Sequence, residues 1–380
     1  MKFELTQEQH LFREMVRDFA AKEVAPLAQR VDEEGIFPNR TIMKMGELGL
    51  MGVAIPADYG GAGGDNVCYA IAVEEIARAC ASTSVIMSVN NSLVADPLYK
   101  FGTEAQKQKY LSPLASGKML GAFALSEPSA GSDAAGQQTT ARRDGDAFVL
   151  NGTKNFITNA READIVLVFA TVDRHLRSKG VCAFIVEKGT PGFTITKVEK
   201  KLGIKGTSCC QLLFEHCRVP ADNLVGEVGK GFKIAMATLD SGRIGIAAQA
   251  VGIAQAALDI SLSYATERVA FDKPIASFQA IQWMIADIAH QTEAARLLTY
   301  RAAWLKDRGV RHTKESAMAK LFASETASRA ATKALQIHGG YGYIYDFPAQ
   351  RLFRDARVTE IYEGTSEIQR LVIAQHLLLS

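Results

Sequence analysis

The spacing of hydrophobic residues changes twice along the chain and divides it into three parts. In the first part, up to about residue 120, apolar residues recur every three or four positions, the period of an α-helix. Thr6 and Gln9 form the pattern of a capping box, in which each side chain bonds the backbone N–H of the other. The apolar positions that follow at helical spacing are Leu11, Phe12, Met15, Val16 and Phe19.

Capping residues mark further helix starts in the same part. Pro38 opens a helix that is predicted to end near Gly49, and Asp65 can cap another helix. Thr103 and Gln106 repeat the capping-box pattern. We therefore predict that residues 1–120 form an all-helical N-terminal domain.

Between residues 121 and 228 the apolar runs shorten to strand length and turn signals recur. The runs FVLNG, DIVLVFATV, VCAFIVE and CQLLFEHCRVP are rich in β-branched and aromatic residues. The turn dipeptides are Asp144-Gly145, Asn151-Gly152, Lys179-Gly180 and Pro191-Gly192. This pattern predicts a middle domain of antiparallel strands.

The third part, residues 229–380, returns to helical spacing. Proline is absent between Pro220 and Pro274 and between Pro274 and Pro348, so very long helices are permitted. Ile244–Leu258 is apolar nearly all round, which indicates burial on every side, in a core or a subunit interface. We predict a bundle of four long helices here. The expected fold class is α+β multidomain: an N-terminal all-α domain, a middle antiparallel β domain and a C-terminal four-helix bundle.

Composition narrows the function classes. The chain of 380 residues is 22% charged with a formal net charge of +2, which argues against an electrostatic nucleic-acid binder. Its longest uncharged apolar stretch is too short to span a bilayer, so we expect no membrane insertion. Six cysteines and seven histidines show no metal-binding spacing, and we expect no metal. Without a secretory signal, we expect reduced thiols in a bacterial cytoplasm or, after processing, in a mitochondrial matrix.

The stretch Ile361–Arg370 (IYEGTSEIQR) contains a carboxylate in an unusual setting. Glu363 ends an apolar run, and Gly364 after it permits positive φ or close backbone approach. An apolar neighbourhood raises the pKa of a carboxyl group and lets it act as a base near neutral pH. Taken alone, the same residues also fit a loop glutamate followed by a helix that is capped at Thr365.

Two stretches of the middle domain suit a polar or planar ligand. The first, Gly121–Asp133 (GAFALSEPSAGSD), combines small residues with hydroxyls that can meet a planar or phosphate-bearing group, although a plain surface turn fits equally well. The second is Phe156-Ile157-Thr158, where an aromatic ring and a hydroxyl could stack on and bond a flavin ring. A half-buried strand has the same appearance.

The third part contains two further stretches. In Gln336–Asp355 (QIHGGYGYIYDFPAQRLFRD), adjacent glycines end a long helix and could cradle a pyrophosphate or the ligand of a neighbouring subunit. The stretch is not GxGxxG and no βαβ unit surrounds it, so a Rossmann site is excluded, and His338 fits a helix terminus better than a catalyst. Asp240–Arg243 is either a polar helix patch with one ion pair or a substrate contact that faces a cleft.

Together these stretches resemble the acyl-CoA dehydrogenase family of flavoproteins over essentially the whole chain. LSEPSAGSD is similar to the family's first signature and IYEGTSEIQR to its catalytic segment. Gln336–Asp355 is similar to the second signature, with Arg351 and Asp355 at the family's spacing. Within the family, Ala81–Leu93 and the run GKGFKIAMATLDSGRIGIAAQAVGIAQAALD are most similar to the short-chain (butyryl-CoA) branch.

The resemblance implies FAD bound noncovalently between the β domain and the bundle. The residues that would hold its isoalloxazine end are Phe123, Leu125, Ser126, Gly131, Ser132, Phe156, Ile157, Thr158, Thr365 and Glu367. Those that would meet its adenosine and pyrophosphate, partly across a subunit interface, are Arg268, Phe271, Gln279, Gln336, Ile337, Gly339 and Gly340. Those that would meet the CoA thioester are Ser132, Asp240, Arg243 and Gly364. Two positions depart from the family pattern: Phe156, where many members have tryptophan, and Asp272, where glycine usually follows the phenylalanine.

The reaction that the resemblance implies is an α,β-dehydrogenation of an acyl-CoA. Glu363 would remove the α proton while hydride leaves the β carbon for the flavin, and the Glu363 amide would help to polarise the thioester carbonyl. Family members of this kind pass electrons to electron-transferring flavoprotein and are usually homotetramers, and we expect both here.

Other readings of the sequence predict different substrates or ligands. A branched substrate, isobutyryl- or 2-methylbutyryl-CoA, is the main alternative. A glutaryl pocket would need a cation near its closed end, and Ala81–Leu93 has none. The isovaleryl and long-chain branches place their base near Asp240–Arg243, where this chain has Gly242, and acyl-CoA oxidases are usually much longer. A DNA-binding relative would need a basic C-terminal face, which the net charge of +2 argues against.

Overall fold

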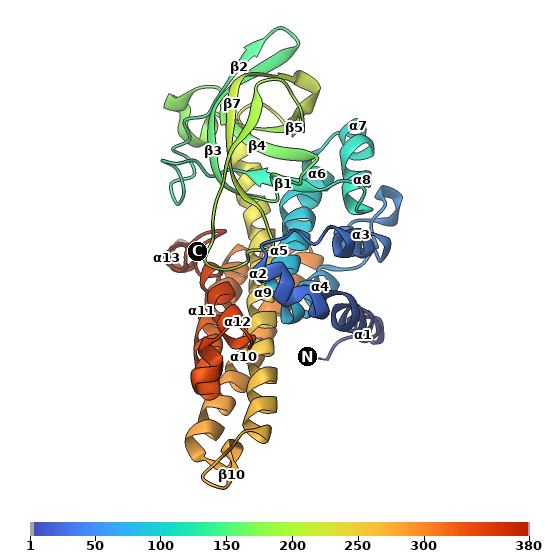
Figure 1. Ribbon diagram of the computed structural model, residues 1–380. Helices are drawn as coiled ribbons and strands as arrows, with labels where there is room; N and C mark the ends of the chain where they lie inside the picture. Colours follow the sequence, from blue (N-terminus) through green and yellow to red (C-terminus); the bar gives the residue numbers. More distant parts are fainter. Residues whose placement is uncertain (1–3, 379–380) are drawn as a thin grey trace.

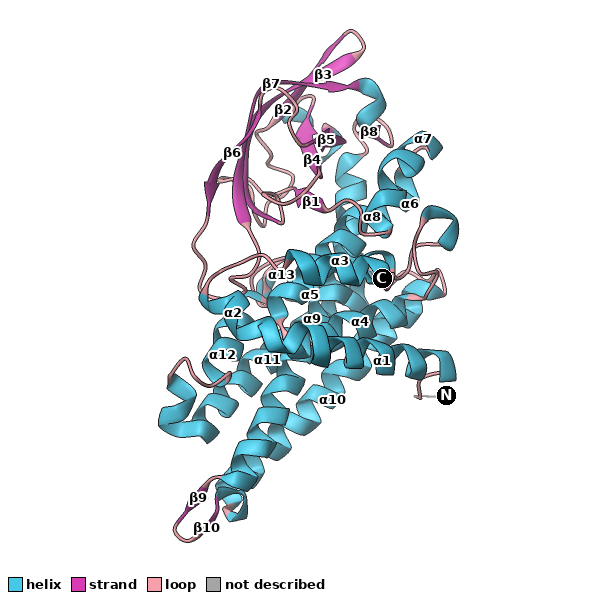
Figure 2. Ribbon diagram, turned by 45° about the vertical axis from the view of Figure 1, so that its right-hand side comes forward, coloured by secondary structure: helices cyan, strands magenta, loops and turns pink. Residues whose placement is uncertain are grey.

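The computed structural model describes residues 4–378 and contains three layers of structure (Figure 1). A sheet lies at one end, the N-terminal helices lie against the middle of the molecule, and long C-terminal helices extend to the opposite end. Strands are thus confined to the upper part, apart from one short hairpin at the lower tip (Figure 2). The predicted order of helical, β and helical regions is confirmed.

Within residues 4–120 the secondary structure of the N-terminal region is helical, with loops between the helices. Its α-helices are α1 (Gln7–Phe19), α2 (Ala28–Glu33), α3 (Asn39–Glu47), α4 (Asn66–Ala79), α5 (Ala81–Ser88), α6 (Asp96–Phe101), α7 (Glu104–Gln106) and α8 (Ser112–Ala115). Three π-helical segments, Ala20–Val24, Val89–Ala95 and Lys107–Leu111, widen the helical turns between them.

The predicted caps are present. Both capping boxes form, with the Thr6 hydroxyl accepting from Gln9 N and the Thr103 hydroxyl accepting from Gln106 N, each at 3.2 Å. The Asp65 carboxylate accepts from the third amide of α4 at 2.6 Å. These local signals therefore fix where the helices begin, since each cap satisfies an amide that the helix itself leaves free.

The middle region is a sheet of eight strands: seven lie in the order β6-β7-β3-β2-β4-β5-β8, and the eighth, β1, pairs with β4. The strands are β1 (Gly121–Ala124), β2 (Thr140–Asp144), β3 (Ala147–Thr158), β4 (Ile165–Thr171), β5 (Val181–Glu187), β6 (Phe193–Val198), β7 (Cys209–Pro220) and β8 (Leu224–Val225). Most pairs are antiparallel, but β1 runs parallel to β4, and β2 and β4 meet in parallel at one residue pair. The prediction of a purely antiparallel sheet is wrong at β1, because about 40 residues separate β1 from β4 and allow the chain to return in the same direction.

One predicted turn is also wrong. Asn151-Gly152 lies inside β3, where the register with β7 shifts, and Gly152 has a φ of 149°. A Cβ there would stand 2.5 Å from the hydroxyl oxygen of Thr139. Gly152 therefore permits a β-bulge within β3. The predicted turn at Asp144-Gly145 does form, and it connects β2 and β3 in a hairpin.

The C-terminal region has three long helices and two short ones, rather than four long helices. The long ones are α9 (Gly231–Glu267), α10 (Gln279–Asp307) and α11 (Thr313–His338), and the short ones are α12 (Ala349–Val358) and α13 (Ser366–Leu378). Both short helices pack on α11, and the hairpin of β9 (Val269–Ala270) and β10 (Lys273–Pro274) lies at the tip. A fourth long helix does not form because turns around Gly339 and Gly364, both at positive φ, divide the chain after α11 into short helices.

Helix α9 is the centre of the molecule. It packs against α4, α10 and α11, and a Cβ at Gly252 would stand 2.3 Å from the Glu74 carbonyl oxygen, so the backbones of α9 and α4 touch. By length and composition alone α9 could cross a membrane, but 78% of its apolar window is buried inside this structure. That burial is the pattern of a core helix and accounts for the all-round apolar sequence of Ile244–Leu258.

Candidate active site

Glu363 lies in the turn between α12 and α13, and the residue as a whole is half-buried. Its φ is +52°, an uncommon value for a residue with a Cβ, and Gly364 follows at +94°. The carboxylate oxygen Oε2 is buried without a hydrogen-bond partner. Burial raises the pKa of Glu363 to about 7, while the charges of Lys320 and Arg243 act to lower it. The direction of this pKa shift is the one that the sequence analysis predicts.

The carboxylate rests on helix α9 at a glycine. A Cβ at Gly242 would stand 2.1 Å from Oε2 of Glu363 and 2.7 Å from Cδ2 of Leu93. One turn further along α9, a Cβ at Gly245 would stand 2.4 Å from Oγ of Ser88. Two missing side chains on one face of α9 thus make the space that Glu363 and its neighbours fill.

Asp240 and Arg243 lie on α9 beside this carboxylate. Nη1 of Arg243 donates to Asp240 at 2.7 Å, and the hydroxyl of Thr313 donates to the other oxygen of Asp240 at 2.6 Å. Nε of Arg243 is buried without a partner. The patch therefore contains the predicted ion pair and also a free N–H next to Glu363.

The backbone around Glu363 is held by two side chains. Gln369 Nε2 donates to the Gly364 carbonyl at 2.8 Å and to the Glu363 carbonyl at 3.3 Å, and Lys320 Nζ donates to Gly364 at 2.7 Å. Thr365 caps α13, as predicted, with its hydroxyl 3.3 Å from the amide of Ile368. Within residues 4–378, the amide N–H of Glu363 makes no hydrogen bond. A donor is thus left free at the side of the carboxylate.

The two predicted stretches of the middle domain lie side by side. The Ser126 carbonyl accepts from Asn155 N at 2.9 Å, which places the loop after β1 against the end of β3. Phe156 there is 64% exposed at a φ of 60°. Ile157 is buried, Thr158 is half-buried, and Phe123 packs on Phe169 at 5.0 Å.

A buried ion pair that the sequence did not reveal supports this loop. Lys154, fully buried on β3, donates to Glu127 at 2.7 Å, to the Leu125 carbonyl at 3.1 Å and to Gln137 at 3.2 Å. Burial lowers the pKa of Lys154 to about 8, with Glu127 opposing the shift. Gly131 and Ser132 lie on the exposed part of the loop, and in the described chain no hydrogen bond joins them to the Glu363 group. The structure thus leaves Ser132 without a direct link to Asp240 or Arg243.

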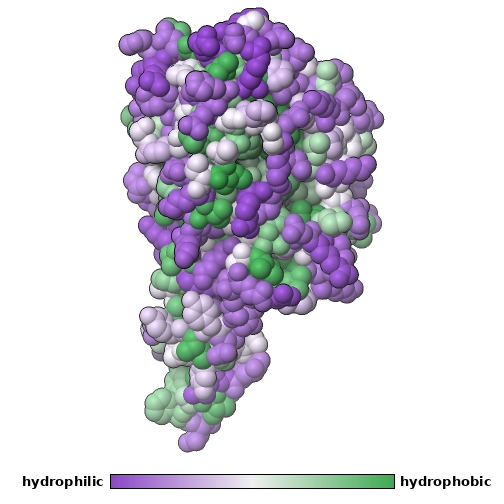
Figure 3. Space-filling model, turned by 45° about the horizontal axis from the view of Figure 1, so that its top comes forward, coloured by the Kyte–Doolittle hydropathy of each residue, from purple (hydrophilic) through white to green (hydrophobic). Residues whose placement is uncertain are grey.

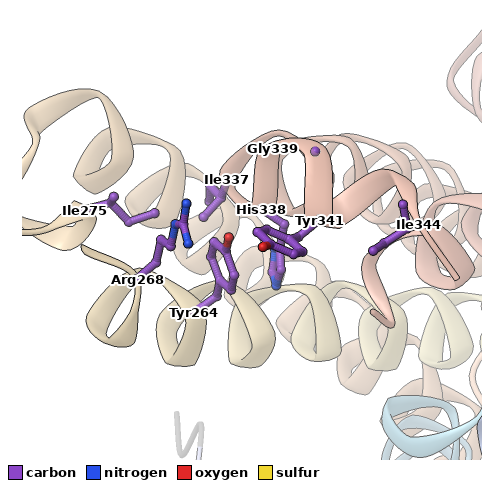
Figure 4. Close-up of a pocket in the computed structure, with 9 residues that line it drawn as sticks. Tyr264, Arg268, Ile275, Ile337, His338, Gly339, Tyr341 and Ile344 are labelled. Carbon is purple, nitrogen blue, oxygen red and sulfur yellow. The ribbon is translucent and has the colours of Figure 1, made fainter. Parts of the chain in front are cut away.

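A pocket of about 540 Å³ lies at the other end of α9 and α11 (Figure 4). It is lined by Tyr264, Arg268, Ile275, Ile337, His338, Gly339, Gly340, Tyr341 and Ile344. The sequence predicted Arg268, Ile337, Gly339 and Gly340 there. It did not predict the aromatic residues, although Tyr264 stacks on His338 with ring centroids 4.3 Å apart. The helical register of Tyr264 and Arg268, four residues apart, was the available signal.

The remaining predicted residues of this end are exposed around the pocket. Phe271 is 88% exposed on the β9–β10 hairpin, and Gln279 and Gln336 are exposed. Asp272, where the family pattern has glycine, has a φ of 63°, a region that aspartate tolerates better than most residues. No atom lies within 4 Å of a Cβ built on Gly339 or Gly340, so their backbone is open to a ligand.

Comparison with known proteins supplies the family. Three domain models of acyl-CoA dehydrogenase match in order: the N-terminal domain over residues 6–118, the middle domain over 122–217 and the C-terminal domain over 229–378. The short-chain specific acyl-CoA dehydrogenase, mitochondrial, of Bos taurus is 58% identical over 99% of this chain and 92% of the relative. The probable acyl-CoA dehydrogenase YngJ of Bacillus subtilis (strain 168) is 56% identical over 100% of this chain and 100% of the relative.

Comparison with solved structures points to the same family. Butyryl-CoA dehydrogenase from Megasphaera elsdenii superposes with a TM-score of 0.98 at 48% identity, covering all of both chains. A chain in the structure of the electron transferring flavoprotein of Acidaminococcus fermentans, described in work on flavin-based electron bifurcation, gives 0.99 at 49% identity, also over all of both chains. The chain described here belongs to the acyl-CoA dehydrogenase family.

Proposed function

We propose that the protein dehydrogenates short-chain acyl-CoA thioesters, converting butyryl-CoA to crotonyl-CoA with FAD as cofactor and Glu363 as the base. The observation that carries the proposal is the buried, unpartnered carboxylate of Glu363, seated on a glycine of α9. Its pKa of about 7 gives it both an ionised population at neutral pH and enough basicity to accept a proton.

Glu363 can perform two tasks with adjacent atoms. Oε2 has no competing hydrogen bond and accepts the α proton of the thioester. The free amide N–H of the same residue donates to the thioester carbonyl, where negative charge develops as that proton leaves. Arg243 on α9 adds positive charge beside both. The positive φ of Glu363 is what presents side chain and amide together, and Gly364 permits the turn that follows.

Acyl-CoA dehydrogenases are FAD-dependent, and the residues present here fit that group. The loop from Phe123 to Ser132 and the exposed ring of Phe156 would hold the flavin end, with Thr365 and Glu367 beside it. The bound flavin would accept the hydride that leaves the β carbon of the substrate. The open backbone of Gly339 and Gly340, with Arg268 nearby, suits the diphosphate and adenosine end.

The two halves of this cofactor site are far apart within one chain. Lys320, beside Glu363, and Ile337, in the pocket, are 17 residues apart on α11, which corresponds to about 25 Å. Hydrophobic side chains such as Val269, Phe271 and Trp283 are exposed near the pocket end, and Figure 3 shows apolar surface at that tip. Both observations support a homo-oligomer, a homotetramer by family resemblance, in which the pocket of one chain meets the FAD of another.

The acyl group would lie beside Glu363, where the preceding residue, Tyr362, would limit the space. The hydroxyl of Tyr362 bonds the side chain of Gln249, and Gln249 Nε2 donates to the Ala81 carbonyl at 2.9 Å. Gln249 and Ala81 are buried, so these bonds tie the turn to α9 and α5 and support a short acyl pocket. A branched substrate of similar length, isobutyryl- or 2-methylbutyryl-CoA, is the alternative. Electron-transferring flavoprotein is the proposed electron acceptor, and a bacterial cytoplasm or a mitochondrial matrix the proposed location.

The test is steady-state oxidation of a series of saturated acyl-CoAs with an artificial electron acceptor. We expect the purified protein to be yellow and its flavin absorbance to bleach when butyryl-CoA is added without oxygen. A colourless protein that takes up no FAD, or a yellow one that no acyl-CoA bleaches, would overturn the proposal.

A further inference from the structure

Lys320 is a buried lysine for which the proposed reaction has no role. It lies on α11 with 0% of its surface exposed, and its ammonium donates to the Gly364 carbonyl at 2.7 Å. In the described part of the chain it has no carboxylate within ion-pair distance, unlike buried Lys154, which pairs with Glu127. A buried ammonium with one hydrogen bond is costly unless a nearby charge compensates it.

The bond from Lys320 reaches the turn that carries the base. Glu363 and Gly364 both have positive φ, and a residue with a Cβ stays in that region only when its surroundings hold it. The two holding groups are Gln369, which bonds both carbonyls, and Lys320, which bonds the second. The direction of the Glu363 amide therefore depends on these two side chains.

The charge of Lys320 also faces the base. The charged and titratable groups around Glu363 are Lys320 on α11, Arg243 with Asp240 on α9, Tyr69 on α4 and Tyr362 on the turn itself. Glu360 and Glu367 lie on the Lys320 side. Arg243 also acts on Glu363 but is paired with Asp240 at 2.7 Å, whereas Lys320 has no paired carboxylate in the described chain and acts more strongly.

We propose that Lys320 is a positioning residue for the catalytic base: its ammonium fixes the turn of Glu363 through the Gly364 carbonyl, and its positive charge keeps the Glu363 carboxylate ionised at neutral pH. The inference rests on the proposed role of Glu363. The electrostatics agree with it, because Lys320 is the largest influence that lowers the pKa of Glu363 against burial. Burial lowers the pKa of Lys320 to about 8, so near pH 7 it still carries its charge.

The test compares pH profiles of kcat/KM for butyryl-CoA. Lys320→Met keeps the side-chain volume and removes the charge. Since the pKa of Glu363 then rises, the acid limb of the profile should move up by about one pH unit, so that kcat/KM at pH 7 falls about fivefold and recovers at higher pH. KM should change little, because the substitution is expected to reduce kcat and not substrate binding. Lys333→Met, on the same helix but paired with Asp287 away from the site, is the control and should keep the wild-type profile.

Two further variants separate the two parts of the role. Gln369→Leu removes the other clamp on the turn and leaves the charge, so kcat should fall while the acid limb stays in place. Lys320→Arg keeps the charge and should keep the limb near the wild-type pH. It also provides the test if Lys320→Met fails to retain FAD, because a Lys320→Arg limb shifted upward would then contradict the proposal.

A folded, FAD-loaded Lys320→Met enzyme whose acid limb coincides with the wild type would overturn this inference and leave the base assignment intact. Full activity of Glu363→Gln would instead overturn the proposed function. The two failures are therefore distinguishable.

Discussion

Replacing Gly242 by alanine would test the geometry of the base directly. An added Cβ would stand 2.1 Å from Oε2 of Glu363, whereas ordinary van der Waals contact begins at 3.4 Å. The carboxylate would therefore have to move by the difference, 3.4 − 2.1 = 1.3 Å. Cδ2 of Leu93 would stand 2.7 Å from the added Cβ, so α9 has little room to shift in order to relieve the clash.

We expect Gly242→Ala to reduce the catalytic rate more than the stability of the fold. A misplacement of about 1 Å can reduce a rate by about 100-fold, so we expect kcat for butyryl-CoA to fall by about that factor. The clash involves the end of a flexible side chain, so Tm and FAD content should stay near the wild type. The assay is steady-state kcat with an artificial acceptor, together with thermal unfolding and the flavin spectrum.

A second glycine on the same helix supplies the contrast. At Gly252 an added Cβ would stand 2.3 Å from the backbone oxygen of Glu74, which cannot rotate away. Gly252→Ala should therefore lower Tm by several degrees, by forcing α9 and α4 apart. If Gly242→Ala keeps more than a third of the wild-type kcat, the carboxylate is not held against α9 as the structure places it, and the reasoning is refuted.

Three further outcomes are expected. Glu363→Gln should bind FAD and substrate but lose turnover by several orders of magnitude, and a residual rate of a tenth or more would show that the base is misassigned. Because the ionised form of Glu363 is the active one and its pKa is raised to about 7, kcat/KM should rise with pH through about 7 and then level off, and a flat profile from pH 5 to 9 would contradict this. In the acyl-CoA series kcat/KM should rise from propionyl to butyryl, hold or fall slightly at hexanoyl and drop steeply by octanoyl, since forcing a methylene into packed atoms costs about 1–3 kcal/mol. A preference still climbing at octanoyl-CoA would show that the contact of Tyr362 with Gln249 does not close the pocket.

Features that depend on near neighbours in the chain could be predicted from the order of residues. The capping boxes at Thr6 and Thr103 join residues three apart, and the alternation of strand-length runs and turns is equally local. The raised pKa of Glu363 was predicted from the apolar run before it, but the structure places its carboxylate against Gly242 of α9, a contact that the local sequence does not show. The roles of the cofactor residues came from family resemblance, since no local pattern distinguishes a flavin loop from a surface turn.

Features that depend on residues far apart in the chain could not be predicted before the fold was known. Asn151-Gly152 looks like a turn in sequence, but β7 pairs with β3 on both sides of it and keeps the strand continuous. Lys320 lies in an ordinary helical sequence, and nothing near it shows that its ammonium reaches a carbonyl 44 residues away. Gly242 is equally unremarkable until the carboxylate of Glu363 occupies the place of its missing side chain. Burial and close approach depend on which surfaces meet. Here the packing of α9, α11 and the turn brings those surfaces together, and the order of residues within any one of these segments does not specify that packing.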